Sequence, residues 1–371
     1  MTSDDSIFNR LFELFQSPGP VNWRLAGEVR KSLVGAAEPV DPTLADEYTE
    51  LAVAAQMRLE PVIRLSMGQP GELQPVDRTV WSTDNQESFG YLVEPLAGTF
   101  GAGLVDPANP MAAMLAPMGP AVLGMQAGTM VGFMAHRTLG QFDTGMPALG
   151  TERLYLVVPN VEGFATDHGL DQRQVRLWAA CHEVAHHAIL DVPWVRPRVT
   201  ELLADFASSV SFDSSKLSET LERMDDPAAI EDVLGGAGGL AGLLGGNHDP
   251  EKLAPIQALL ATIEGYGDQV VGLALTDIAP ELGPIQEAWA RRRAEPGQAE
   301  QFLSQLIGLE LERHHAGDAT RLFTEIGRRW GMDSVDSLWS SPESAPILAE
   351  LTDPVGWAAR VLLTDPMDET L

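Results

Sequence analysis

The 371-residue sequence has little cysteine, few aromatic residues and a shortage of positive charge. Its one cysteine, Cys181, excludes an internal disulfide and favours a reducing compartment. Lysine and arginine number 24 against 53 aspartates and glutamates, and the net charge of -29 argues against nucleic acid or an anionic membrane as a partner. No basic segment followed by an apolar run opens the chain, so we expect no secretory signal and a cytoplasmic location.

Residues 107–135 carry no charge and could be mistaken for a membrane span. Three prolines break the first half, which leaves about fifteen apolar residues, too few to cross a hydrocarbon core of roughly 30 Å. Gly124, Gly128 and Gly132 recur every four residues in the second half. This spacing predicts a buried helix that another helix approaches closely.

The spacing of apolar residues predicts a mainly α fold (α+β with one small strand region) in a single compact domain, residues 1–371. We expect the strand at 153–159, because this segment is short, contains β-branched residues and ends at a proline. We expect residues 1–20 to form a loosely attached helix. The glycine-rich residues 234–250 predict a flexible loop. A dinucleotide site is not expected there, because no strand pattern precedes these residues. Helices are expected at 23–37, 43–66, 81–92 (ended by Pro95), 197–212, 214–224, 252–273, 281–293, 298–311, 316–330 and 356–363.

The segment Cys-His-Glu-Val-Ala-His-His-Ala, residues 181–188, contains an HExxH motif formed by His182, Glu183 and His186. Two histidines four residues apart project from one helix face, where they can hold a zinc ion, and the glutamate can reach a water on that ion. Asp171 is a suitable N-cap, and Gln174 three residues later completes a capping-box pattern.

The alternative is a core helix whose histidines bond to the backbone or to carboxylates. The apolar stripe that includes the two histidines favours the metal, because a buried imidazole without a partner is costly. A catalytic zinc needs a third protein ligand, for which Glu201 and Glu264 are candidates. Each has an aspartate four residues later, Asp205 or Asp268, that could fix a histidine ring. The apolar run before Glu264 and the glycines after it favour Glu264, but Glu201 stays open.

These motifs resemble those of the zincin-like metallopeptidases of type 2, a largely actinobacterial family with a branch associated with deazaflavin coenzyme biosynthesis. The resemblance covers nearly the whole chain. It rests on Gly-Pro-Val-Asn-Trp-Arg-Leu-Ala at 19–26, Leu-Gly-Gln-Phe-Asp at 139–143, Val-Pro-Asn at 158–160, Trp-Ala-Ala-Cys-His-Glu-Val-Ala-His at 178–186, Val-Pro-Trp-Val-Arg-Pro at 192–197, Glu-Gly-Tyr-Gly-Asp at 264–268 and Leu-Ile-Gly-Leu-Glu at 306–310.

The resemblance implies a zincin-like fold with the HExxH helix at its core and one Zn²⁺ per chain. It maps the metal ligands to His182, His186 and Glu264, and the catalytic glutamate to Glu183. Relatives often carry Gln-Tyr where His314 and His315 stand; if that tyrosine helps to stabilise an oxyanion, a histidine would replace it in this chain.

The expected activity is zinc-dependent hydrolysis of a peptide or amide substrate, with Glu183 accepting a proton from zinc-bound water. Candidate oxyanion donors are Tyr266, His187, His314 and His315, among which the sequence does not choose. A small-molecule amidase and a catalytically silent binding or scaffold protein are the alternatives. Oligomeric state does not follow from the sequence.

Overall fold

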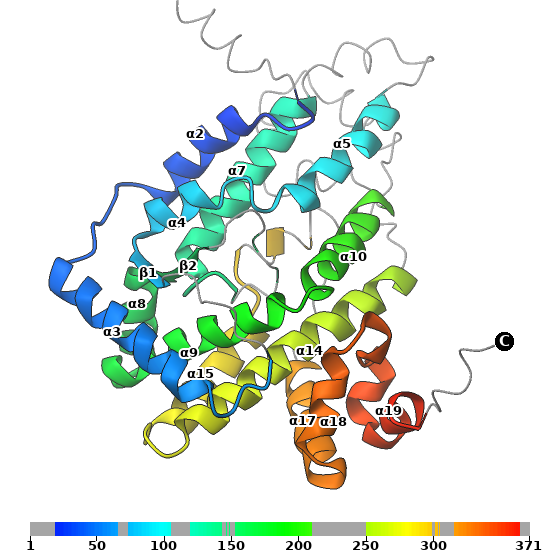
Figure 1. Ribbon diagram of the computed structural model, residues 1–371. Helices are drawn as coiled ribbons and strands as arrows, with labels where there is room; N and C mark the ends of the chain where they lie inside the picture. The colour runs from blue at the N-terminus through cyan, green and yellow to red at the C-terminus, as the bar shows by residue number, and fades with distance from the viewer. Residues whose placement is uncertain are drawn as a thin grey trace, which may run out of the picture.

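The computed structural model describes residues 19–65, 73–104, 119–142, 146, 148, 153–209, 250–298, 301–302, 304 and 315–363. Helices make up most of this part of the chain and surround two short strands (Figure 1). The prediction of a mainly α fold is therefore confirmed. The elements are α2 (Trp23–Val34), α3 (Pro42–Leu59), β1 (Leu73–Val76), α4 (Arg78–Asp84), α5 (Gly90–Leu104), α7 (Gly119–Arg137), β2 (Leu154–Val157), α8 (Val158–His168), α9 (Gln172–Leu190), α10 (Val195–Ser209), α14 (Pro250–Leu275), α15 (Leu282–Ala294), α17 (His315–Trp330), α18 (Met332–Asp336), η2 (Ser337–Trp339), η3 (Pro342–Ser344), η4 (Leu348–Thr352) and α19 (Pro354–Val361).

Helix α9, which carries the HExxH motif, lies at the centre of the described helices. Every residue from Trp178 to Leu190 is buried. The helix packs against α3 on one side and α14 on another, and it also contacts α8 and β2 (Figure 1). A helix that is buried on all sides must satisfy its polar side chains internally, which makes the histidines and the glutamate of this helix conspicuous.

The N-terminus of α9 is tied to the start of α15. Asp171 caps α9 as predicted, because its carboxylate accepts a hydrogen bond from the Gln174 N–H at 2.9 Å. The Gln174 side chain does not return the bond. Its oxygen accepts from the N–H of Glu281 at 2.8 Å, and the Glu281 carboxylate accepts from the Asp171 N–H at 2.7 Å. These bonds replace the predicted capping box and fix α15 beside α9.

The strand predicted at 153–159 is β2, which pairs in parallel with β1, a strand that was not predicted. On its other side, Leu156 forms an antiparallel bridge with Gly140, and the Val157 N–H donates to the Leu139 carbonyl at 2.7 Å. Both sides of β2 are therefore occupied. The bridge brings the chain that follows α7 alongside β2 and, as described below, against α9.

The glycines of α7 contact α2 as the sequence predicted, and the two helices run side by side in Figure 1. A Cβ on Gly124 would lie 2.3 Å from the Asn22 carbonyl oxygen, and one on Gly128 would lie 2.3 Å from the Ala26 carbonyl oxygen. These contacts are with backbone, which cannot move away as a flexible side chain can. Glycine is thus required for the close approach of the helices.

The prediction of one helix at 81–92, ended by Pro95, is wrong in two respects. Helix α4 ends at Asp84, where the Asn85 side chain donates to the Trp81 carbonyl at 2.9 Å, and a new helix, α5, begins at Gly90. Pro95 lies inside α5 rather than at its end. It is the sixth residue of α5, beyond the first four positions whose N–H groups have no helical partner, so the helix continues through it without one hydrogen bond.

Several predictions fall outside the described residues: the helix within residues 1–18, the helix at 214–224, the loop at 234–249 and most of the helix at 298–311. The single-domain interpretation stays a prediction. Within the described residues, no helix combines the length and the apolar character that crossing a membrane requires.

We expect Gly128→Ala to lower the free energy of unfolding by about 1–3 kcal/mol, because the added methyl group overlaps backbone of α2. Gly163→Ala in α8 is the matched control, since its Cβ would meet no atom within 4 Å. This control should be neutral or stabilising by up to about 1 kcal/mol. Urea unfolding measures both variants, and equal effects would contradict the proposed close approach.

Candidate metal centre

His182 and His186 lie one turn apart on α9, and their rings stand side by side. The ring centroids are 4.0 Å apart with an angle of 31° between the planes. Both side chains are buried, at 3% and 1% exposure. The i, i+4 spacing of the motif therefore has the consequence that the sequence predicted, two imidazoles on one face of a helix.

Glu264 reaches the same place from α14. Its carboxylate oxygen Oε2 lies 3.9 Å from His186 Nε2, and one ligand atom from each of His182, His186 and Glu264 lies within 4.8 Å of the others. Two ligands of one tetrahedral metal ion, each about 2.1 Å from it, stand about 3.4 Å apart. The distances between the three ligand atoms therefore need to shorten only a little for these side chains to bind one metal ion.

The ring of His186 is oriented by its own helix. Its Nδ1–H donates to the His182 carbonyl at 2.9 Å, which leaves Nε2 as the atom that faces Glu264. That Nε2 is buried and forms no hydrogen bond to any residue that the structure describes. Burial, followed by the neighbouring His182, lowers the pKa of His186 and favours the neutral imidazole that metals bind. These features fit a metal ligand.

Close packing of α14 on α9 depends on a glycine. A Cβ on Gly267 would lie 2.5 Å from Cε1 of His186. On the other side of α14, a Cβ on Gly265 would lie 2.5 Å from the Ala319 Cβ and 2.8 Å from the Thr320 nitrogen of α17. The two glycines that follow Glu264 thus permit close packing of α14, one against α9 and the other against α17.

Asp268 does not contact a histidine as the sequence suggested. Its carboxylate binds Arg293 of α15, and the same guanidinium donates from Nη1 to Glu264 Oε2 at 2.8 Å. The Arg293 side chain is 9% exposed and lies over the ring of Trp289, with 5.5 Å from its Cζ to the ring centroid. The two carboxylates raise the pKa of Arg293 against the opposing effect of burial. Arg293 thus links Asp268 to Glu264. Sequence analysis assigned Arg293 no role.

Glu183 faces the segment that pairs with β2. Its carboxylate accepts a hydrogen bond from the Gln141 N–H at 2.7 Å and a weaker one from the Phe142 N–H at 3.5 Å. Its Oε1 is 3.7 Å from Nδ1 of His182. A Cβ on Gly140 would lie 2.2 Å from the Glu183 carboxylate carbon, so this approach requires a glycine.

The segment beside Glu183 is itself fixed by a pair of buried amides. Asn85 Nδ2 donates to Gln141 Oε1 at 3.2 Å, and Gln141 Nε2 donates to Asn85 Oδ1 at 2.6 Å. Sequence analysis gave these residues no role. The signal was present in Leu-Gly-Gln-Phe-Asp at 139–143, which contributed to the family resemblance, but nothing in its spacing shows that it contacts Glu183.

Glu201, the alternative third ligand, is not near the cluster of ligand atoms. It is an exposed residue of α10 whose carboxylate pairs with Arg198 at 2.7 Å. Its partner Asp205 pairs with Lys252 at 2.9 Å. The direction of α10 after α9 carries both carboxylates to the surface, so Glu264, which the sequence favoured, stays the candidate and Glu201 is dropped.

Tyr266, a candidate oxyanion donor, packs between α14, α17 and η2. Its buried ring contacts Phe323 and Trp339. Tyr266 lies on a different side of α14 from Glu264, because two residues turn a helix by about 200°. Burial raises the pKa of Tyr266 to about 12.

The histidines suggested as oxyanion donors are placed as follows. His315 begins α17, where its Nδ1 lies 3.3 Å from an Asp318 oxygen. His187 Nε2 lies 3.3 Å from an Asp191 oxygen, and burial lowers the pKa of His187. His314 lies outside the described residues. None of these contacts identifies an oxyanion donor.

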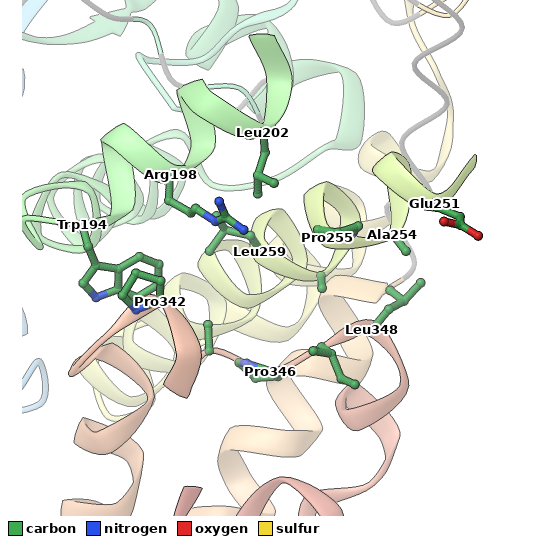
Figure 2. Close-up of a pocket in the computed structure, with 13 residues that line it drawn as sticks. Trp194, Arg198, Leu202, Glu251, Ala254, Pro255, Leu259, Pro342, Pro346 and Leu348 are labelled. Carbon is green, nitrogen blue, oxygen red and sulfur yellow. The ribbon is translucent and has the colours of Figure 1, made fainter. Parts of the chain in front are cut away.

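A separate cavity of about 280 Å³ lies between α10, α14 and the segment 342–348 (Figure 2). Trp194, Arg198 and Pro255 are among the residues that line it, together with Ile347. None of the three clustered ligand residues lines this cavity. We therefore assign it no part in the metal centre.

Metal analysis of the purified protein should find close to one ion per chain, because the cluster offers one set of three donors. His186→Ala and Glu264→Ala should lose the ion, since each removes a donor. Glu201→Ala is the control and should keep it. An ion that persists in Glu264→Ala would overturn the assignment of the third ligand.

Gly267→Ala should weaken metal binding roughly tenfold or more, because its methyl group displaces the His186 ring. Gly272→Ala, on the same helix, is a suitable control because its Cβ would meet only the end of the Gln286 side chain, at 3.2 Å. Titration of the metal against a chelator measures both variants. A normal affinity in Gly267→Ala would show that the ring does not need this position.

The comparisons with known proteins agree with the geometry. The chain is similar to a proposed hydrolase of novel fold from Chloroflexus aurantiacus. The two sequences are 21% identical, the TM-score is 0.63, and the similarity covers 93% of this chain and 99% of the other. At this identity the likeness shows the fold alone. No curated protein matches the chain significantly. A family model described as zincin-like metallopeptidase matches residues 21–358, nearly the whole chain, and so the protein belongs to the zincin-like metallopeptidase family.

Proposed function

We propose that the protein is a zinc-dependent hydrolase that cleaves peptide bonds, with zinc held by His182, His186 and Glu264 and with Glu183 as general base. The observation that carries the proposal is the buried cluster of three ligands with Glu183 adjacent to the first of them. Membership of a metallopeptidase family supports it.

The donor set favours zinc over the hard cations. Two imidazole nitrogens and one carboxylate form one of the three-ligand sets of catalytic zinc, whereas Mg²⁺ and Ca²⁺ prefer oxygen ligands throughout. Three protein ligands leave one position for water or substrate. A bound zinc ion would polarise the carbonyl of a substrate and lower the pKa of water at this position.

Glu183 would accept a proton at its carboxylate and pass it to the departing amine. Three features support this assignment. The side chain is buried at 1% exposure, it follows a metal ligand directly, and backbone N–H groups of residues 141–142 restrict its orientation. A fixed carboxylate loses little freedom when the reaction begins, which favours proton transfer.

A binding or scaffold protein that keeps the metal but has no turnover is the competing function. It would need the three ligands, but it would not need a carboxylate beside them in the interior, where an ionised group is costly to bury. The presence of Glu183 therefore favours a hydrolase. An amidase acting on a small molecule would use the same chemistry, and only the substrate distinguishes it from a peptidase.

Glu183→Gln should retain about one zinc per chain and lose hydrolysis by roughly 10²–10⁴-fold, the usual contribution of a general base. The glutamine is of nearly the same size, and its one amide oxygen can still accept the shorter of the two backbone hydrogen bonds, the one from the Gln141 N–H. Peptide libraries and small amides, tested with wild type and with this variant, measure the effect and separate a peptidase from an amidase. A substrate that both proteins cleave at the same rate would exclude the proposed role of Glu183.

A further inference from the structure

Helix α15 lies against the metal centre and contributes two side chains to it, although it supplies no ligand. Arg293 bonds to Glu264, as described above, and Trp289 packs edge-on against the His182 ring with 5.3 Å between centroids and 75° between planes. Arg293 in turn lies over the Trp289 ring. The two residues are one turn apart, so a single face of α15 touches two of the three candidate ligands.

Arg293 binds the oxygen of Glu264 that matters for the metal. The oxygen that accepts its hydrogen bond, Oε2, is the one that lies 3.9 Å from His186 Nε2. A carboxylate oxygen has two lone pairs, so Oε2 can accept an N–H and bind a cation together. Without this bond the glutamate side chain, with three rotatable torsions, would have other rotamers available.

The charges explain why an arginine is needed here. Glu264 and Asp268 stand one turn apart on α14, both largely buried, with side-chain exposures of 9% and 20%. Two carboxylates so placed repel each other, and burial strengthens that repulsion. Arg293 is positioned between them and binds one with each Nη atom.

The charge that remains suits a divalent ion. Counted as formal charges, with the imidazoles as neutral, Glu183, Glu264 and Asp268 contribute three negative charges and Arg293 one positive charge. Two negative charges remain, which a divalent cation balances. Arg293 therefore orders the glutamate and leaves the cluster attractive to the metal.

We propose that Arg293 is the positioning residue of the metal centre: held by Asp268, it sets the Glu264 carboxylate as the third ligand before the ion arrives. The inference rests on the proposed function only in taking this cluster as the zinc site. A lysine cannot replace this arginine, because it lacks the planar fork that reaches two carboxylates with fixed geometry.

The test measures zinc affinity of the full-length, metal-free protein by competition with a chromophoric chelator, together with the visible spectrum of the Co²⁺-loaded protein. Arg293→Lys keeps the charge and removes the fork, so it should bind zinc about 10- to 100-fold more weakly and show an altered cobalt spectrum. Asp268→Asn should shift the affinity in the same direction. Arg291→Lys is the matched control, since Arg291 is 64% exposed on the same helix, and it should behave as wild type.

Wild-type affinity and spectrum in Arg293→Lys would overturn the proposal, as would an equal loss of affinity in the control. If Arg293→Lys does not fold, as judged by circular dichroism, then Asp268→Asn decides, and an affinity equal to that of wild type in it overturns the proposal. A wild-type protein that binds no zinc would refute the proposed function as well. Zinc binding that is equal in all variants would refute the role of Arg293 alone.

Discussion

The contact between α9 and α14 is the constraint on which the site depends. The HExxH helix supplies two histidines by its own periodicity, but two imidazoles do not make a catalytic metal centre. The third donor comes from a helix some eighty residues later, and it arrives only because Gly267 lets α14 lie against the His186 ring. The close approach of the two helices thus adds a third candidate ligand to the two of the sequence motif.

Electrostatics form the second level of organisation. The interior around α9 holds Glu183, Glu264 and Asp268, an arrangement that would be unstable without compensation. Backbone N–H groups stabilise the Glu183 carboxylate, and Arg293 stabilises the pair on α14. The same contacts restrict the orientation of the carboxylates. Charge compensation and positioning are therefore achieved by the same few groups.

Features that depend on residues close together in the sequence were predictable, and those that depend on residues far apart in the sequence mostly were not. Local patterns were sufficient for the mainly α fold, the Asp171 cap, the strand at 154–157 and the close approach of another helix to the glycines of α7, because each is determined by neighbouring residues or a short repeat. Glu264 was favoured over Glu201 from the apolar and glycine pattern around it, and in the structure the Glu264 carboxylate lies near the two histidines while Glu201 is exposed. Arg293 could not be found, because in the sequence a basic residue at the end of a helix resembles an exposed one such as Arg291, and only packing buries its side chain.

Other errors have similar physical causes. Strand β1 contains Pro75 and has only four residues, so its pattern is weak, and it exists because β2 offers it a partner. Tyr266 stands between two functional glycines in the sequence, but the rotation of the helix directs it to α17 and η2 instead. Gln174 does not bond to its predicted partner because the carboxylate of Glu281, which is distant in sequence, accepts from the Asp171 N–H, and the Glu281 N–H donates to the Gln174 side chain.

The most direct test of the account is anomalous diffraction from crystals grown with zinc, with data collected on both sides of the zinc absorption edge. The account predicts one strong peak per chain, about 2.0–2.2 Å from a nitrogen of His182, His186 Nε2 and an oxygen of Glu264. A peak at other residues, or an empty cluster in crystals that bind zinc elsewhere, would contradict it.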